Sequence, residues 1–463
     1  MYKNFKTNIG SIVVLLAIAG GLILVIYPPA FFSPRESRVA ALAIVAIGFW
    51  ATMIIPEHLT ALLFFFLAMI FSLAPANVVF SGFESTAMWL IFGGLVIGVG
   101  ITGTGLGNRI ADKVVVHLNG NYLRIISGVV IAGVLFSFLM PSSMGRIIFL
   151  IPVTLAIADH FDFAEGSNGR IGIVLAATLG AVIPAYAILP SNVVNMVLVG
   201  MAETQFNISP LYGEYLALHF PVLGLLKSLV IIGLIVWMYP DKPGKAVKGE
   251  MKTTRPMSKN EVLLSVILIV LLALWITDFI HHISPAWIAL GGAVLLLMPR
   301  INIVTGKQFN ENINYGSLFF VAGILGLGGM VSHSGLGDML AQKLIASFPL
   351  GEDRPFINYM SLSLASLFTA VGATIPGAPA VITPLSDQLS VVTGWSIKTI
   401  IMTQMLGFST VIFPYQVPSI VIGMQLSGEK LSSAIKVCFI LAAITIFFLL
   451  PINYFWWKAL GWL

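Results

Sequence analysis

Residues 124–158 read RIISGVVIAGVLFSFLMPSSMGRIIFLIPVTLAIA, an apolar stretch that Pro141 and the small residues after it interrupt near its middle. A helix that crosses a membrane needs roughly 20 predominantly apolar residues. Non-helical backbone at membrane depth is tolerated only where protein buries it or where it lines a wet cavity. For this one proline taken alone, a kinked membrane-spanning helix would be the simpler interpretation.

A second apolar stretch, residues 356–394, carries a matching interruption. Its Pro376-Gly377-Ala378-Pro379-Ala380 corresponds to Pro141-Ser142-Ser143-Met144-Gly145. Because a proline with small residues recurs in register, we predict two re-entrant hairpins in place of two kinked spans. Their tips are expected near Ser142-Ser143 and Gly377-Ala378.

The rest of the chain repeats in the same order. The set Gly93, Gly98, Gly105, Leu106, Gly107, Ala111 and Lys113 returns 230 residues later as Gly323, Gly328, Gly335, Leu336, Gly337, Ala341 and Lys343. The polar segment Pro190-Ser191-Asn192-Val193-Val194-Asn195 corresponds to Pro414-Tyr415-Gln416-Val417-Pro418-Ser419. Three correspondences in one order indicate an internal repeat.

The composition places this repeat in a membrane. Of 463 residues, 58% are hydrophobic and only 9% are charged, whereas a soluble domain carries about 25% charged residues. Apolar runs recur along the whole length, which excludes a single-span receptor with a large polar domain, and a β-barrel would show short alternating runs instead. We therefore predict an all-α polytopic membrane protein with about 11 transmembrane helices, two inverted repeats, two re-entrant hairpins and broken helices.

Each half holds five crossings and one hairpin, and an odd number of crossings inverts the second half relative to the first, as in many secondary transporters. With a cytoplasmic N-terminus, most Lys and Arg of the loops fall on the cytoplasmic side, as the positive-inside rule expects. We expect a multi-pass protein of the bacterial inner membrane. The predicted parts are an N-terminal transmembrane helix at 1–30, repeat 1 at 31–240 with its hairpin near 124–158, a basic cytoplasmic linker at 241–260, and repeat 2 at 261–463 with its hairpin near 356–394.

The two hairpin tips and the two polar segments should meet near the midplane. Helix N-termini at such breaks suit an anion, and exposed carbonyl oxygens suit Na⁺. The alternative for the asparagines and the glutamine is a hydrogen bond between helices. The candidate substrate-binding residues are Ser142, Ser143, Asn192, Asn195, Thr374, Gly377, Ala378, Gln416, Ser419 and Arg146.

Three ionisable residues lie within apolar stretches. Arg146 follows the first tip and either faces the anion or snorkels to the membrane surface. Lys227 could serve an anion path or pair within the bundle, and Asp387 could bind a proton or contact solvent. The segments 106–118 and 335–348 have the striped pattern of amphipathic helices.

The arrangement resembles the divalent anion:sodium symporter family, of the ion-transporter superfamily. The similarity lies in Trp89-Leu90-Ile91-Phe92-Gly93-Gly94, in Thr104-Gly105-Leu106 and in Arg109-Ile110-Ala111, and Ser142-Ser143-Met144 stands where the family has Ser-Asn-Thr. The second tip, Thr374-Ile375-Pro376 or Gly377-Ala378-Pro379, departs further. The resemblance implies a homodimer, an elevator-type movement, and Na⁺ bound by Ser142, Ser143, Asn192, Thr374, Gly377 and Gln416.

The leading hypothesis is cation-coupled import of a small anion, a dicarboxylate or a sulfate-like oxyanion, with Na⁺ preferred to H⁺ as the coupling ion. An anion exporter or exchanger, or a cation/proton antiporter of the same superfamily, is the alternative. An enzyme is not expected, because the sequence lacks a His-Glu-x-x-His motif, paired aspartates and an acidic cluster. We expect the lipid bilayer and a small anion as partners, and neither nucleic acid nor a cofactor. The single Cys438 permits no internal disulfide.

Overall fold

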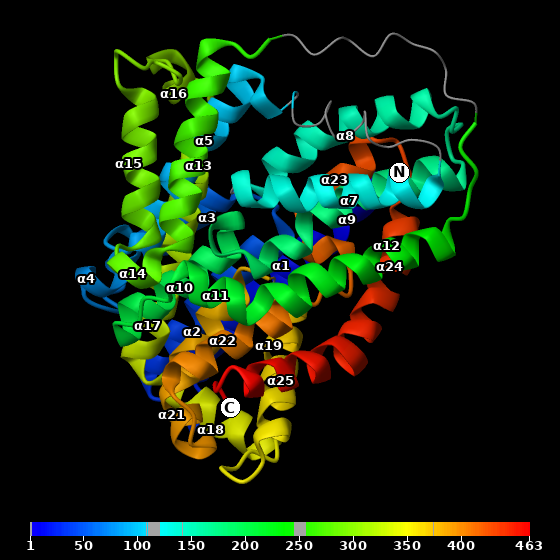
Figure 1. Cartoon of the computed structure of the whole chain (residues 1–463). Helices are drawn as coiled ribbons and strands as arrows, with labels where there is room; N and C mark the ends of the chain where they lie inside the picture. The colour runs from blue at the N-terminus through cyan, green and yellow to red at the C-terminus, as the bar shows by residue number, and fades with distance from the viewer. Residues whose placement is uncertain (1, 108, 110–120, 141, 245–255, 374) are drawn as a thin grey trace.

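The computed structural model describes residues 2–463 except 108, 110–120, 141, 245–255 and 374. Helices form nearly all of this part, and no strand occurs in it (Figure 1). The helices of the first half are α1 Tyr2–Ile26, α2 Pro34–Thr52, α3 Glu57–Ile70, α4 Ala76–Val79, η1 Ser81–Phe83, α5 Thr86–Thr104, α7 Tyr122–Leu139, α8 Ser143–His160, α9 Asn168–Val182, η2 Pro184–Ala187, η3 Leu189–Ser191, α10 Val193–Phe206, α11 Tyr212–His219, η4 Phe220–Leu226 and α12 Lys227–Met238.

The second half begins after the linker. Its helices are α13 Lys259–Ile276, α14 Asp278–His281, α15 Pro285–Leu297, α16 Gly306–Asn312, α17 Tyr315–Ser334, α18 Leu336–Ser347, α19 Pro355–Ala373, α20 Gly377–Ile382, η5 Thr383–Leu385, α21 Ser386–Thr393, α22 Ile397–Phe408, η6 Pro414–Gln416, α23 Pro418–Leu426, α24 Leu431–Ile444, η7 Thr445–Leu449 and α25 Leu450–Ala459.

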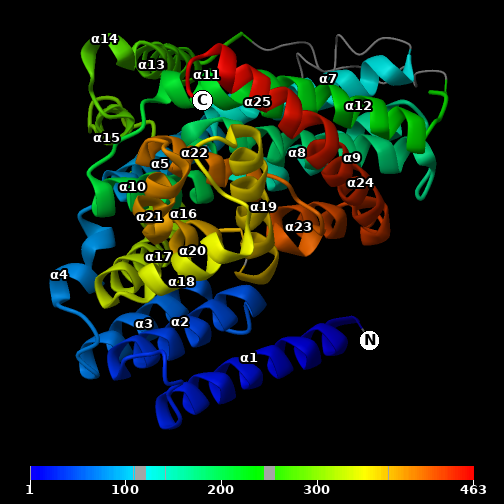
Figure 2. The same cartoon turned by 90° about the horizontal axis from the view of Figure 1, so that it is seen from below.

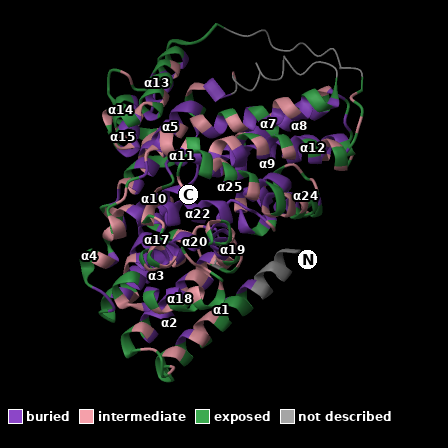
Figure 3. Cartoon of the chain, turned by 60° about the horizontal axis from the view of Figure 1, so that its bottom comes forward, coloured by how far each residue is buried: buried purple, intermediate pink, exposed green. Residues whose placement is uncertain are grey.

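The described part holds eight helices long and apolar enough to cross a membrane, together with five shorter apolar helices. This confirms the predicted all-α polytopic fold. Buried residues gather in the middle of the molecule around α10, α17 and α22, while α1 and the α13–α14 region carry many exposed residues (Figure 3). Exposed apolar side chains on such helices match lipid as the solvent.

The two halves pack through corresponding helices. Helix α5 of the first half lies against α15 of the second, and α17 of the second half lies against α3 of the first. The repeated glycines make both contacts possible: a Cβ on Gly93 would stand 2.6 Å from the carbonyl carbon of Ala289, and a Cβ on Gly323 would stand 2.7 Å from the Cβ of Ala61. The repeated glycines therefore make the same kind of close helix contact in both halves. Helices α1–α3 run along the edge of the molecule opposite α13 (Figure 2).

Both predicted hairpins are present as helical pairs. In the first, α7 and α8 meet at Met140 and Ser142, on either side of Pro141. In the second, α19 meets the short helix α20 at Ile375 and Pro376, after which the chain continues through η5 and α21. The striped segment 335–348 forms α18, and most of segment 106–118 lies outside the described residues.

Both predicted breaks are present as well. Between α9 and α10 the chain forms two 3₁₀ turns, η2 and η3, and between α22 and α23 it forms one, η6. Each half therefore ends one helix and begins another inside the bundle. Helix α10 packs on α20 and α22, while α23 packs on α8 and α9, so each break lies against the hairpin of the other half.

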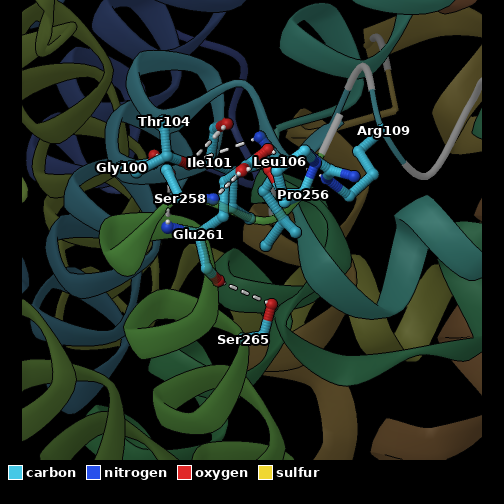
Figure 4. A network of polar contacts seen from close by, with 9 residues as sticks. All are labelled: Gly100, Ile101, Thr104, Leu106, Arg109, Pro256, Ser258, Glu261 and Ser265. Atoms are coloured by element: carbon cyan, nitrogen blue, oxygen red, sulfur yellow. Dashed lines mark hydrogen bonds and ion pairs between the residues drawn. The ribbon is translucent and has the colours of Figure 1, made fainter. Parts of the chain in front are cut away.

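An ion pair holds the end of the linker against the region that follows α5. Ser258 and Glu261 form a capping box that begins α13, and Arg109 Nε donates to Glu261 Oε1 at 3.1 Å. Arg109 Nη2 also donates to the carbonyl oxygen of Pro256 at 3.3 Å, so its side chain joins the region after α5 to the start of repeat 2 (Figure 4).

The glycine contact between α5 and α15 gives a stability prediction. We expect Gly93→Ala to lower the melting temperature of the detergent-solubilised protein, because its methyl group would overlap the α15 backbone and overpacking costs about 1–3 kcal/mol. Gly291→Ala is the control, since a Cβ there meets no atom within 4 Å. Equal melting temperatures for the two variants would contradict the close contact.

Candidate functional site

All four interruptions line one cavity of about 520 Å³. The first tip contributes Ser142 and Ser143, and the second contributes Ile375 and Pro376. The breaks contribute Pro190 and Asn192 from the first half and Gln416, Val417, Pro418 and Ser419 from the second. Helices α3, α5 and α17 close the remaining side with Glu57, Ile91, Gly94, Gly98, Thr102, Ser317 and Phe320.

Four helices begin at this cavity. The first residues of α8, α10, α20 and α23 follow directly on Ser142, Asn192, Pro376 and Val417, which all line it. A helix N-terminus carries a partial positive charge and amide N–H groups without helical acceptors. Four such ends at one cavity favour an anion as its occupant.

The first half caps its two N-termini with side chains. Ser142 Oγ accepts from the Gly145 amide at 3.1 Å, and Asn192 Oδ1 accepts from the Asn195 amide at 3.0 Å. Because the Ser142 hydroxyl oxygen accepts this bond, its hydrogen is free to be donated to a ligand. Neither α20 nor α23 has a side-chain cap, so the second half offers mainly backbone groups.

Asn195 holds the first break in shape. Its Nδ2 donates to the carbonyl oxygens of Tyr186 at 3.1 Å and Ile188 at 2.9 Å, and more weakly to that of Ala185. These carbonyls belong to the non-helical segment between α9 and α10. Each of these carbonyls also accepts a second bond, the Ile188 carbonyl from the Ser191 amide and the Tyr186 carbonyl from the Tyr215 hydroxyl. The Asn195 side chain therefore ties together the turns of the break, as the alternative interpretation of a structural asparagine expects.

Gln416 does the same for the second break. Its Oε1 accepts from the amides of Ile412 at 2.9 Å and Phe413 at 2.8 Å. Its Nε2 is buried and has no hydrogen-bond partner in the described part. The amide group thus stabilises the loop with its oxygen and retains N–H donors beside the cavity.

Arg146 lies fully buried between the first tip and the first break. Its Nε donates to the Ala181 carbonyl at 2.9 Å, and its Nη1 donates to the carbonyls of Ser191, at 2.9 Å, and Met140. Its Nη2 donates to Ser143 Oγ at 3.0 Å. The guanidinium therefore joins tip to break, and it does not snorkel to the membrane surface.

Lys227, at the start of α12, is also buried, with 1% of its surface exposed. Its Nζ donates to the carbonyl oxygen of Ser409 at 3.0 Å, at the end of α22. Asp387, in contrast, is exposed and does not line the cavity.

The structure brings most of the predicted residues together. Ser142, Ser143, Asn192, Gln416 and Ser419 line the cavity, while Asn195, Arg146, Gly377 and Ala378 are buried behind that lining. Thr374 lies outside the described residues.

Several lining residues escaped the sequence analysis: Glu57, Thr102, Tyr186, Asn312, Asn314 and Ser317. Asn312 ends α16, and Asn314 and Ser317 lie at the start of α17, the helix that repeats α5. Their polar cluster before an apolar run was the available signal. In the described part, no group of three or more His, Cys, Asp or Glu residues could hold a metal ion.

Comparison with known families agrees with this geometry. The model of the sodium:sulfate symporter transmembrane region matches residues 6–463. The chain belongs to this family. This confirms the predicted family resemblance. The homologues in this family are transporters and not enzymes, which confirms the expectation that the protein is not an enzyme.

The relatives are distant in sequence. Dicarboxylate transporter 1 of the Arabidopsis thaliana chloroplast is 25% identical over 345 residues, which cover 72% of this chain and 61% of that protein. The L-tartrate/succinate antiporter of Escherichia coli K12 is 24% identical over 289 residues, 58% of each chain. A membrane protein of Cupriavidus necator is 23% identical over 395 residues, 82% of this chain and 76% of that one.

The fold is also similar to a solved structure. The YdaH transporter of Alcanivorax borkumensis superposes with a TM-score of 0.54 at 14% sequence identity, over 86% of this chain and 89% of that one. At this identity the likeness concerns the fold alone. It supports the arrangement of the helices described above.

The bonds of Asn195 give a second prediction. We expect Asn195→Ala to lower the melting temperature, because it removes the hydrogen bonds from Asn195 to the Tyr186 and Ile188 carbonyls, and a buried hydrogen bond contributes about 0.5–1.5 kcal/mol. Thr410→Ala serves as a control at a buried site, since the Thr410 hydroxyl donates only to the Leu406 carbonyl within its own helical region. A melting temperature of Asn195→Ala equal to that of the control would show that Asn195 does not hold the break.

Proposed function

We propose that the protein is a secondary transporter that carries a small dianion of the dicarboxylate class across a bacterial inner membrane, with its N-terminus in the cytoplasm. The observation that carries this proposal is the meeting of four helix N-termini, from two halves, at one cavity. The cavity volume, about 520 Å³, falls within the range of roughly 300–1,000 Å³ usual for small-ligand sites. Relatives named for dicarboxylate, tartrate and succinate transport support this substrate class.

The movement is proposed to be of the elevator type in a homodimer. The hairpins and broken helices form one group of elements around the cavity, and α3, α5 and α17 line its other side. In this proposal the first group travels with the anion while the second group stays in the membrane. The packing of each hairpin against the break of the opposite half supports their movement as one body.

Two forms of coupling follow from the sequence and the site. The first candidate is cation-coupled import, with Na⁺ preferred to H⁺, which follows from the family resemblance. In this form, the first half would offer more side-chain oxygens as cation ligands than the second. Exchange of one anion for another is the second candidate. A relative named for L-tartrate/succinate antiport supports this second candidate.

The side chain of Ser142 provides the test of the proposed anion-binding site. We expect Ser142→Ala to raise the dissociation constant of succinate about 10-fold or more, because a hydrogen bond to a charged group contributes about 1.5–3 kcal/mol. Succinate binding to the purified protein is measured by calorimetry or by thermal shift.

Ser167→Ala is the matched control, since Ser167 Oγ caps α9 by accepting from the Arg170 amide and does not line the cavity. Both variants lose an N-cap, worth about 1 kcal/mol of stability. Only Ser142→Ala should bind succinate more weakly. Equal affinity in both variants would remove the Ser142 hydroxyl from the binding site.

The coupling ion is tested in proteoliposomes with labelled succinate, first under a Na⁺ gradient alone and then under a pH gradient alone. Cation-coupled import predicts accumulation under one of these gradients in vesicles that contain no succinate. Without coupling to a cation, a divalent anion is driven out of a negative-inside cell. Moving each elementary charge inward against the membrane potential costs about 2.3 kcal/mol per 100 mV.

A further inference from the structure

Glu57 is the one residue with an ionisable acidic or basic side chain among the described Asp, Glu, Lys, Arg and His residues that line the anion cavity. It is the first residue of α3 and lies half-buried on the wall formed by α3, α5 and α17. The opposite wall holds the hairpin tips and the breaks, where four helices begin. One carboxylate therefore shares with four helix N-termini a cavity that we assign to an anion.

The carboxylate of Glu57 has no partner in the described part of the chain. No ion pair between described residues includes it, and Trp50 Nε1 donates at 3.1 Å to its backbone carbonyl oxygen, not to its side chain. The half-buried Glu203 differs, because its carboxylate accepts from the Thr86 amide at 2.9 Å and from the Thr86 hydroxyl at 2.7 Å. The side-chain oxygens of Glu57 are thus available to a proton or to a ligand.

Few charged groups lie on the helices around this carboxylate. Helix α3 packs on α2, α4 and α17, and neither α4 nor the lining helix α5 has a titratable residue. The titratable residues of α2 and α17 are Arg35, Glu36, Arg38, Tyr315 and His333. Those of α2 lie at its start, about 18 Å or more along the helix from Trp50 at 1.5 Å per residue, and His333 lies at the far end of α17.

The other groups near the cavity already have partners. The Tyr315 hydroxyl donates to the Phe309 carbonyl at 2.8 Å, and Lys307 and Glu311 on α16 pair with each other at 4.0 Å. On the opposite wall, the tyrosine Tyr186 lines the cavity, and the N–H groups of Arg146 behind the lining donate to the tip and the break.

His58 is the charged neighbour that must be considered with Glu57. It follows Glu57 in the chain, is exposed and does not line the cavity. Its charge acts on the Glu57 carboxylate. A protonated His58 favours the ionised form of Glu57 and also attracts an anion, so an experiment has to separate the two residues.

An ionised Glu57 and a dianion in the same cavity repel each other. Like charges that share a site favour the uptake of a proton by one of them. A bound dicarboxylate therefore raises the affinity of Glu57 for a proton, and by reciprocity a proton on Glu57 raises the affinity for the dicarboxylate. The protonated carboxyl group also gains an O–H donor for the anion.

We propose that Glu57 is a proton-binding site that sets the affinity of the cavity for dianions, its ionised form promoting release and its protonated form promoting binding. This inference rests on the proposed function. In the proposed movement α3 stays in the membrane, so the proton is not carried with the anion. It acts only while the cavity lies against α3, and the affinity for the anion falls as the pH on that side rises.

The test compares succinate binding by the full-length wild-type protein and by Glu57→Gln, whose side chain is neutral at every pH. Succinate itself takes up a proton as the pH falls, and the ratio of the two dissociation constants cancels this contribution. We expect Glu57→Gln to bind succinate about tenfold more tightly than wild type at about pH 8. This advantage should shrink about threefold or more by about pH 6, where Glu57 takes up its proton in the complex. An advantage that is absent at the higher pH, or that does not change with pH, would overturn the inference.

Two control variants keep Glu57. His58→Gln removes the neighbouring charge, and Glu311→Gln removes an exposed negative charge on α16, next to the lining residue Asn312. Both should bind succinate with the pH dependence of the wild-type protein. Loss of this dependence in His58→Gln would assign it to the histidine, and binding by Glu311→Gln as tight as that by Glu57→Gln would reveal a general effect of charge. Either result would overturn the inference.

A measurement on the wild-type protein does not depend on whether the variants fold. At about pH 7.5, where free succinate is almost entirely doubly ionised, the heat of binding in two buffers of different ionisation enthalpy gives the number of protons taken up. We expect net proton uptake. Succinate binding without proton uptake would overturn the inference and leave the proposed anion transport intact, whereas no succinate binding at any pH would overturn both.

Discussion

Backbone groups that lose their helical partners inside a membrane have no water to replace them, and each one left unsatisfied costs several kcal/mol. The chain meets this constraint at four places at once, two hairpin tips and two breaks. At the first break, Asn195 donates to the non-helical carbonyls, and at the second, Gln416 accepts from the non-helical amides. The rest of the structure depends on these bonds, because they allow helices to begin in the middle of the bundle and to direct their N-termini at one cavity.

The halves solve the same problem with different chemistry. The first uses side chains: Ser142 and Asn192 cap helices, and Arg146 joins tip to break. The second uses glycine and alanine at its tip and takes its buried cation, Lys227, from the opposite half. An inverted repeat gives the same backbone arrangement twice, but the side chains can diverge, so a site built at the pseudo-symmetric centre need not bind the same ion on both sides.

The sequence predicts the architecture well because its signals are periodic and repeated. Two prolines in register, recurring glycines and long apolar runs were enough to predict the helical fold, the hairpins and the breaks. The limits of the site were harder to predict. Glu57 reaches the cavity only through packing between distant helices, and no local pattern marks that contact. The same reason explains Arg146. Its sequence position suggested a residue that either faces the anion or snorkels to the membrane surface, whereas its partners lie on three separate segments that only the fold assembles.

Fixed and mobile cations have different consequences for an anion carrier. A mobile Na⁺ enters with the anion and brings the energy of its gradient, and the empty carrier can return because both have left. A guanidinium or ammonium anchored in the core neutralises the anion equally well during the crossing, but it cannot leave. The energy for transport must then come from a second anion travelling in the opposite direction. The cavity that selects the anion can therefore be the same in both kinds of carrier. What differs is whether the compensating cation is fixed to the protein or free to leave, and this decides whether the carrier concentrates its substrate.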